Sequence, residues 1–225
     1  MGVKYFLGVD LGQSVDYTAL ALVEWAETQG EWDAAYYAWR KKIGLRLAYL
    51  ERAPRGTPYP KIVERVRGMV TDREMAGRCT LVVDATGVGQ AVVDMLEWSR
   101  PGCPLWKVKI TGGDGERYID GHYRVPKKDL VARVQVLLQQ GTLEIAKGLK
   151  HGATLAREMA EMRVRVTAGG HEQFGAWREG EHDDLVLALT LGCWGAVKAH
   201  PETMSKDGGH WRREGAEFFG KTRIL

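Results

Sequence analysis

Four aspartates of this 225-residue chain have the residue type and the setting to do metal chemistry. Asp10 and Asp84 each end a short apolar segment and precede a loop that contains glycine. Apolar runs of this kind are typical of strands that are buried on both faces. If the two strands are neighbours in one sheet, their carboxylates emerge side by side at its carboxyl edge, where open α/β sheets place their sites.

The other two aspartates are adjacent, Asp183–Asp184, and they open the segment Asp184–Val197, which is apolar nearly all round. A helix N-cap followed by a favourable first-turn charge would explain this pair, but not the two strand-end acids. Carboxylates gathered in a partly dry site repel one another unless cations neutralise them. Hard oxygen ligands favour Mg²⁺ or Mn²⁺. All four aspartates are therefore candidate metal ligands.

Phosphodiester hydrolysis is the chemistry that uses such a cluster, with two metal ions about 3.5–4 Å apart. One ion lowers the pKa of the attacking water, and the other stabilises the leaving 3′ oxygen. Because protein side chains mainly hold the metals, several carboxylates and no covalent nucleophile are expected. The sequence offers no Ser-His-Asp or Cys-His arrangement that competes with this interpretation.

The composition is that of a soluble globular protein, with 44% hydrophobic and 27% charged residues in a length that suits one domain. No apolar run reaches the ~18 residues of a membrane span, and the N-terminus lacks a signal-peptide pattern. The three cysteines have no metal-ligand spacing, and their odd number argues against a disulfide framework. We expect an intracellular protein that does not enter membranes.

Basic residues gather in short clusters, although the net charge of +3 is too small to indicate a nucleic-acid partner by itself. Arg40 and Lys42 lie in one such cluster, and Lys127 and Lys128 head a predicted helix. These four side chains are candidate contacts to DNA phosphates. A solvated charged face is the commoner meaning of a charge run, and for the lysine pair it is an equally good interpretation.

The hydrophobic pattern predicts the elements that position these residues. The predicted strands are 5–10, 18–25, 34–43, 80–84 and 105–110, with a turn at Gln29-Gly30 between the second and third. The predicted helices are 60–70, 91–98, 128–140, an amphipathic stripe from Leu155 to Val166, and 184–197, and a hairpin is expected over 163–167 and 174–177.

The segment Thr111–Tyr123 is expected to be a long loop. The order of elements implies an α/β fold with a mixed five-stranded sheet, its first three strands antiparallel, and helices on both faces. Residues 1–199 are expected to form one domain, and residues 200–225 a flexible polar tail.

Four segments resemble the nuclease domain of large terminase subunits, the DNA-packaging proteins of tailed phages. They are Leu7-Gly-Val-Asp-Leu-Gly12, Val82-Val-Asp-Ala-Thr-Gly-Val-Gly89, Val125-Pro-Lys-Lys-Asp-Leu130 and His182-Asp-Asp-Leu-Val186, in order and with suitable gaps. The resemblance implies a ribonuclease H-like fold, related to that of the Holliday-junction resolvases. It also implies a Mg²⁺- or Mn²⁺-dependent endonuclease that cuts concatemeric viral double-stranded DNA before and after packaging.

By position, the resemblance assigns the metals to Asp10, Asp84 and Asp184, with Asp183 as a fourth acid. His182 is a candidate contact to this site, and a surface or capping histidine is an equally good interpretation. The resemblance further implies a terminase ATPase domain, the small terminase and the portal protein as partners, in the cytoplasm of the infected host. Because no ATPase precedes Met1, we expect an excised nuclease domain or a stand-alone relative, and Met1-Gly2 just before the first strand favours excision.

Other interpretations of the sequence are weaker. Residues 215–222 match the phosphate-loop pattern G-x-x-x-x-G-K-[ST], but a polar segment precedes them and only three residues follow. The segment Asp10–Thr18 resembles the first phosphate loop of the sugar-kinase, actin and heat-shock ATPases, which need two duplicated domains and give no role to Asp183–Asp184. A Holliday-junction-resolvase-like nuclease and an inactive DNA-binding relative are the remaining alternatives.

Overall fold

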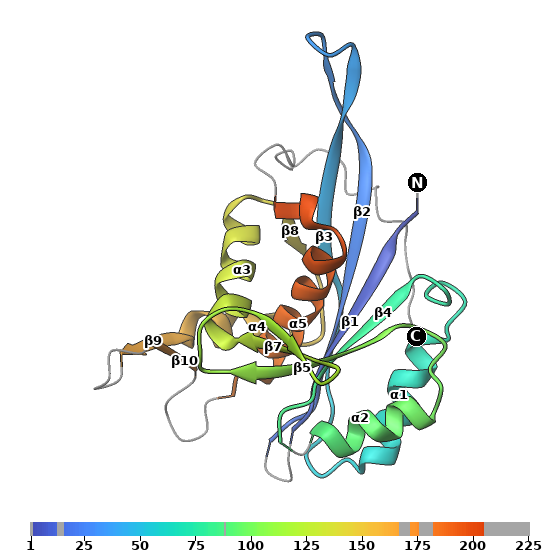
Figure 1. Ribbon diagram of the computed structural model, residues 1–225, viewed down its shortest axis with the longest axis vertical. Helices are drawn as coiled ribbons and strands as arrows, with labels where there is room; N and C mark the ends of the chain where they lie inside the picture. The colour runs from blue at the N-terminus through green and yellow to red at the C-terminus, as the bar shows by residue number, and fades with distance from the viewer. Residues whose placement is uncertain (1, 13–15, 88, 167–171, 176–181, 205–225) are drawn as a thin grey trace.

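The structure is a computed structural model that describes residues 2–12, 16–87, 89–166, 172–175 and 182–204. Its main sheet has eight strands in the order β6-β7-β5-β4-β1-β2-β3-β8 (Figure 1). The strands are β1 Lys4–Asp10, β2 Ala19–Asp33, β3 Ala38–Arg52, β4 Cys79–Asp84, β5 Leu105–Thr111, β6 Arg117–Ile119, β7 His122–Pro126 and β8 Leu143–Ile145, and the pair β9 Arg163–Val166 and β10 Glu172–Gly175 forms a separate hairpin. The helices are α1 Tyr59–Val70, α2 Gly89–Trp98, α3 Lys127–Gln139, α4 Gly152–Glu161, α5 Asp184–Ala199 and the short 3₁₀ helix η1 Pro201–Met204.

Strand β1 lies near the middle of the sheet, antiparallel to β2 and parallel to β4. Every residue of β1 after Lys4 is buried, as its apolar sequence predicts for a strand covered on both faces. Val9 pairs with Val83, so the next residues, Asp10 and Asp84, follow on neighbouring strands at the same edge. The predicted pairing of the two strand-end aspartates is confirmed.

Helices cover both faces of the sheet (Figure 1), as predicted. The alternation of side chains along a strand divides the core into two layers. Phe6 of β1 belongs to the layer with α3, α4 and α5, whereas Leu7 belongs to the layer with α1 and α2. The site end of β1 therefore lies between two packed layers of helices.

Helix α5 lies directly against the centre of the sheet. All residues from Asp184 to Val197 are buried, as their sequence predicts for a helix that is apolar nearly all round. Gly8 of β1 permits the contact, because a Cβ atom there would collide with the backbone carbonyl of Ala188 and with the backbone nitrogen of Gly192. This close approach fixes the start of α5, and so fixes Asp183 and Asp184 relative to Asp10.

We predict that Gly8→Ala destabilises the protein by about 1–3 kcal/mol, the usual cost of overpacking a core. The added methyl group meets backbone on α5, which cannot move aside as a flexible side chain would. The midpoint of thermal unfolding measures the effect. Gly68→Ala is the matched control: this helical glycine has open space around it, so alanine there should stabilise by a few tenths to 1 kcal/mol. Equal stability of Gly8→Ala and the wild type would contradict the packing argument.

Several element boundaries differ from the prediction. Strands β2 and β3 continue beyond the expected turn at Gln29-Gly30 and reverse at residues 34–37 instead. The expected loop Thr111–Tyr123 contains β6 and the start of β7, which add to the sheet edge next to β5. Helix α4 ends at Glu161, so Val166 of the predicted stripe belongs to β9 instead.

The five predicted strands form the contiguous centre of the sheet, β5-β4-β1-β2-β3, and the short strands β6, β7 and β8 extend it at both edges. The hairpin predicted around residues 163–177 is present as β9 and β10. At the C-terminal end of the domain, Trp25 donates a hydrogen bond from Nε1 to Thr203 Oγ1 of η1 at 3.0 Å, so residues 201–204 pack on the domain. Residues 205–225, with the pattern at 215–222, lie outside the described residues.

Candidate active site at the carboxyl ends of strands β1 and β4

Asp10 is a buried carboxylate at the end of β1. Its residue surface is 8% exposed, and none of the described residues donates a hydrogen bond to its side chain. Burial raises the pKa of Asp10 well above its usual range, and the negative charges of Asp84, Asp183 and Asp184 raise it further. The four predicted aspartates are therefore near enough to repel one another, as expected of a cluster that a cation would neutralise.

Asp84 is held in place by Thr86. The backbone nitrogen and Oγ1 of Thr86 both donate to Asp84 Oδ1, at 2.8 and 2.5 Å. Thr86 Oγ1 in turn accepts a hydrogen bond from the backbone nitrogen of Ile110 on β5 at 2.9 Å. Burial raises the pKa of Asp84, while the Thr86 bonds and the charge of Lys127 oppose the shift. Thr86 thus orients one oxygen of the carboxylate.

Asp183 and Asp184 enter the site from the start of α5. Asp183 occupies the N-cap position, but its side chain makes no capping hydrogen bond. Instead, Lys127 donates from Nζ to Asp183 Oδ2 at 2.6 Å, and Arg52 donates from Nε to Asp184 Oδ2 at 2.7 Å. The carboxylate of Asp183 therefore pairs with Lys127 and does not cap the helix.

Arg52, at the end of β3, bridges two buried acids. Besides Asp184, its guanidinium forms an ion pair with Glu158 of α4. The second carboxylate oxygen of Glu158 accepts a hydrogen bond from the backbone nitrogen of Val186 at 3.4 Å. Burial, then the charge of Asp184, raises the pKa of Glu158 to about 7, although Arg52 opposes the shift. Arg52 and Glu158 thus tie the site end of α5 to β3 and α4.

The raised pKa of Glu158 predicts a pH-dependent stability. In the unfolded chain the carboxyl group ionises near its ordinary pKa of 4.5, whereas in the folded chain it ionises near 7. Stability of the metal-free protein therefore falls as pH rises from about 4.5 through about 7. We expect Glu158→Gln to gain a few degrees in Tm relative to the wild type across this window, measured in EDTA. A Tm difference that stays constant with pH would contradict this assignment.

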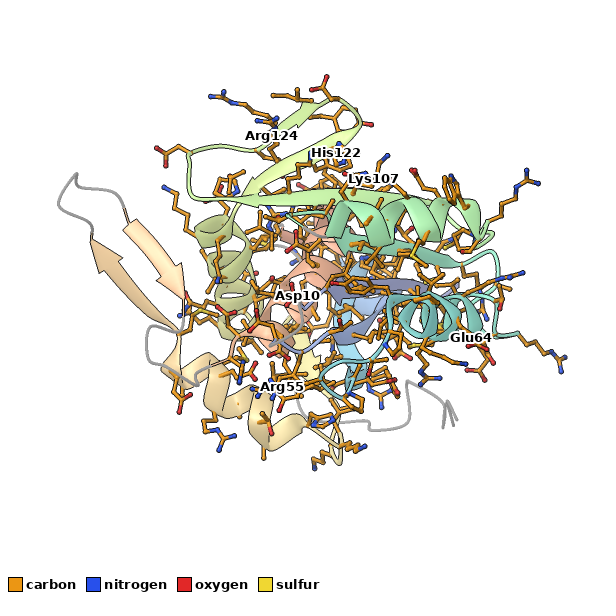
Figure 2. All side chains as sticks on the ribbon, turned by 90° about the horizontal axis from the view of Figure 1, so that it is seen from below. Asp10, Arg55, Glu64, Lys107, His122 and Arg124 are labelled. Carbon is orange, nitrogen blue, oxygen red and sulfur yellow. The ribbon has the colours of Figure 1, made fainter. Side chains whose placement is uncertain are left out.

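His182 lies beside the aspartates, next to an arginine and a tyrosine. Its Nε2 is 2.7 Å from an Nη of Arg55, and its ring meets the ring of Tyr17 edge-on, with centroids 5.1 Å apart. The guanidinium carbons of Arg52 and Arg55 lie 4.7 and 4.4 Å from the Tyr17 ring centroid. Figure 2 looks onto this end of the sheet and labels both Asp10 and Arg55.

The predicted basic residues lie in different places. Lys127 reaches the aspartates, whereas Lys128 forms an ion pair with Asp114 in the β5–β6 loop. Arg40 and Lys42 are on the β2–β3 hairpin, which projects from the opposite end of the sheet (Figure 1). Arg40 forms an ion pair with Asp33 of the same hairpin at 2.7 Å. Of the four candidate DNA contacts, only Lys127 lies at the aspartate cluster.

The donor set of the cluster fits a divalent cation in its chemistry. Asp10 is a buried carboxylate with no hydrogen-bond donor among the described residues. The negative charges of three further carboxylates raise its pKa, and carboxylate oxygens are ligands for hard divalent cations. Among the residues that the structure describes, however, no three acidic, histidine or cysteine side chains converge closely enough to hold an ion. Asp183 and Asp184 form ion pairs with Lys127 and Arg52. A bound cation would have to draw these oxygens toward Asp10.

Thr86, Arg52 and Glu158 are neighbours of the aspartates that were not predicted from the sequence. A signal for Thr86 exists in Asp84-Ala-Thr86, because an aspartate commonly accepts hydrogen bonds from the residue two positions later. Arg52 and Glu158 are separated by 106 residues in the chain. No local pattern connects them, so only the fold brings them together.

Comparison with known proteins identifies the class of fold. The predicted ribonuclease H-like fold is confirmed, because solved structures of this class align over most of the chain. No protein-family model matches the sequence, and no curated protein matches it either. None of the described helices is long and apolar enough to cross a membrane.

Large terminases of phages are among the similar solved structures. The nuclease of thermophilic phage G20c with bound magnesium has a TM-score of 0.56 and 22% identity, covering 85% of this chain and 81% of its own. The nuclease domain of Thermus phage P74-26 has a TM-score of 0.55 and 19% identity, covering 84% and 78%. The HK97 bacteriophage large terminase has a TM-score of 0.50 and 15% identity, covering 87% of this chain and 40% of its own. The chain has the fold of the large terminase nuclease domain.

Proposed function

We propose that this chain is a divalent-metal-dependent endonuclease that cleaves double-stranded DNA by hydrolysing a phosphodiester bond. The observation that supports this function best is the buried carboxylate of Asp10, which accepts no hydrogen bond from the residues that the structure describes and lies beside Asp84 in the strand register. An ionised carboxylate is costly to bury alone, so a site of this kind calls for a cation. The fold shared with the G20c terminase nuclease, solved with bound magnesium, supports the same activity.

In this proposal Asp10, Asp84 and Asp184 hold two divalent cations, Mg²⁺ or Mn²⁺, with Asp183 as a fourth acid. Such ions would lower the pKa of an attacking water and stabilise the negative charge of the leaving 3′ oxygen. The side chains of the protein then hold the cations, orient the substrate and screen its charge. For this reason the site needs several carboxylates and no nucleophilic serine or cysteine.

The neighbours of the aspartates have separate roles in this proposal. Thr86 fixes Asp84 through two hydrogen bonds to Oδ1, and in this proposal the other oxygen of that carboxylate binds a cation. Arg52 fixes Asp184 through a hydrogen bond and an ion pair. Lys127 holds Asp183 at 2.6 Å and supplies a positive charge where the DNA backbone would approach.

The biological substrate follows from the family resemblance. We propose that the nuclease cuts concatemeric viral DNA during genome packaging, in the cytoplasm of the infected host. A terminase ATPase domain, the small terminase and the portal protein are the proposed partners. Arg40, Lys42 and Lys128 stay candidate DNA contacts, remote from the aspartates or paired within the chain.

The proposed function is tested by incubating the protein with supercoiled plasmid and either Mn²⁺ or Mg²⁺. We expect nicked and linear products, none in EDTA, and none with Asp84→Ala. The proposal is wrong if the wild type fails to cut the plasmid with any divalent metal. It is also wrong if Asp84→Ala cuts as fast as the wild type. ATP hydrolysis by the same sample, without plasmid cleavage, would favour the sugar-kinase-like and actin-like alternative.

A further inference from the structure

Arg55 is an exposed arginine that the structure holds in one place beside the aspartate cluster. It lies in the turn Pro54–Thr57, where the backbone nitrogen of Thr57 and its Oγ1 both donate to the carbonyl oxygen of Pro54. Gly56 has a φ of +74°, which only glycine adopts readily, and so lets this turn close. The backbone nitrogen of Ala53 donates to the carbonyl oxygen of Thr18 at 2.8 Å, which ties the turn to β2.

The side chain of Arg55 contacts Tyr17 and His182. Its guanidinium carbon lies 4.4 Å from the centroid of the Tyr17 ring, and one Nη contacts His182 Nε2 at 2.7 Å. Arg52 meets the same ring at 4.7 Å, and Arg52 is itself fixed by Asp184. A guanidinium stacked on an aromatic ring loses little rotamer freedom when it binds a further group.

Arg55 differs from the other basic residues near the site because it has no acidic partner among the described residues. Lys127 pairs with Asp183, Arg52 with Asp184 and Glu158, and Lys128 with Asp114. Within the described part of the chain, no carboxylate lies in ion-pair distance of Arg55. Its remaining N–H groups are therefore available to an anion from outside the protein.

We infer that Arg55, stacked on Tyr17 and braced by His182, forms a subsite for a backbone phosphate of the DNA strand next to the bond that is cut. The inference rests on the proposed function and specifies one of its substrate contacts. A planar guanidinium binds two phosphate oxygens at once, which fixes the position of the strand as well as its charge. His182, next to Asp183 in the chain, links this subsite to the start of α5.

The test measures binding of the full chain to a fluorescently labelled DNA duplex by anisotropy, in Ca²⁺, with a gel to verify that the duplex stays intact. We expect Arg55→Gln to weaken binding about tenfold and to lower the slope of log affinity against log salt by about 1. Tyr17→Leu keeps the charge and removes the stack, so it should weaken binding less and leave the salt slope unchanged.

Arg73→Gln is the matched control, because Arg73 is exposed and lies in the loop before the amino end of β4, away from the aspartates. In plasmid cleavage with Mn²⁺, Arg55→Gln should raise KM more than it lowers kcat. If Arg55→Gln binds like the wild type, or if Arg73→Gln has the same effect, the subsite is refuted. If the wild type binds DNA through Arg55 but does not cut DNA with any divalent metal, the proposed function fails and the subsite stands.

Discussion

Asp10→Asn will abolish metal-dependent DNA cleavage and will at the same time stabilise the metal-free protein. Activity should fall by more than about 100-fold, since even the loss of an indirect partner of a metal ligand costs 10–100-fold. Stability should rise because Asp10 is buried beside three other negative charges, with no hydrogen-bond donor among the described residues. Removing such a charge is worth about 1–3 kcal/mol, or roughly 2–10 °C in Tm for a chain of this size.

The two effects are separated by pH and by metal. Because burial and the neighbouring acids raise the pKa of Asp10, its ionisation costs stability as pH rises through that pKa. The gain from asparagine in EDTA should therefore be large at pH 8 and small near pH 4. Asp94→Asn, on the exposed surface of α2, should leave both cleavage and Tm unchanged. If Asp10→Asn is less stable than the wild type in EDTA, other groups of the protein compensate the charge of Asp10, and the predicted gain in stability is wrong.

The pairing of Asp10 with Asp84 could be predicted because the signal is local. Each residue ends a run of buried apolar residues, and neighbouring parallel strands present their ends at one edge. The buried start of α5 was equally predictable, because Asp184–Val197 is apolar on every face. In both cases the apolar pattern of the sequence directly matches the burial of the residues in the fold.

The turn between β2 and β3 was predicted wrongly for a physical reason. Gly30 is part of an irregularity in the β2–β3 pairing, between Gln29 and Trp32, and not part of the turn. Glycine in a strand often marks such a bulge, where a side chain would crowd the partner strand. A Cβ atom on Gly30 would approach the carbonyl oxygen of Arg40 to 3.0 Å. The chain instead reverses at residues 34–37, where Tyr37 adopts a φ of +49°.

The partners of Asp184 could not be predicted, because no local pattern encodes them. Glu158 lies on a helix whose apolar residues Leu155 and Met159 predict only which face meets the core. Its burial depends on the end of β3, which supplies Arg52 from 106 residues earlier. The burial of Glu158 can be recognised only after the fold has placed Arg52 beside it.

Arg52→Ala should be the most destabilising of the substitutions considered for this site, by about 3–5 kcal/mol, because it leaves Asp184 and Glu158 buried without their common partner. Their side chains are only 7% and 4% exposed, so water cannot replace the lost guanidinium. We expect a loss of roughly 10 °C in Tm at pH 8. Lys61→Ala breaks an exposed pair with Glu64 and should change Tm by close to zero.

Three further measurements distinguish charge compensation by Arg52 from simple packing. Adding Glu158→Gln to Arg52→Ala removes one of the two stranded charges, so the double variant should recover part of the lost stability. Mn²⁺ should raise the Tm of Arg52→Ala more than that of the wild type, because a cation then meets carboxylates that no arginine neutralises. Arg52→Lys keeps the charge but loses the planar guanidinium, so its Tm should lie between those of the wild type and Arg52→Ala. If neither Glu158→Gln nor Mn²⁺ restores stability, Arg52 acts through packing, and Asp184 owes its position to the start of α5 alone.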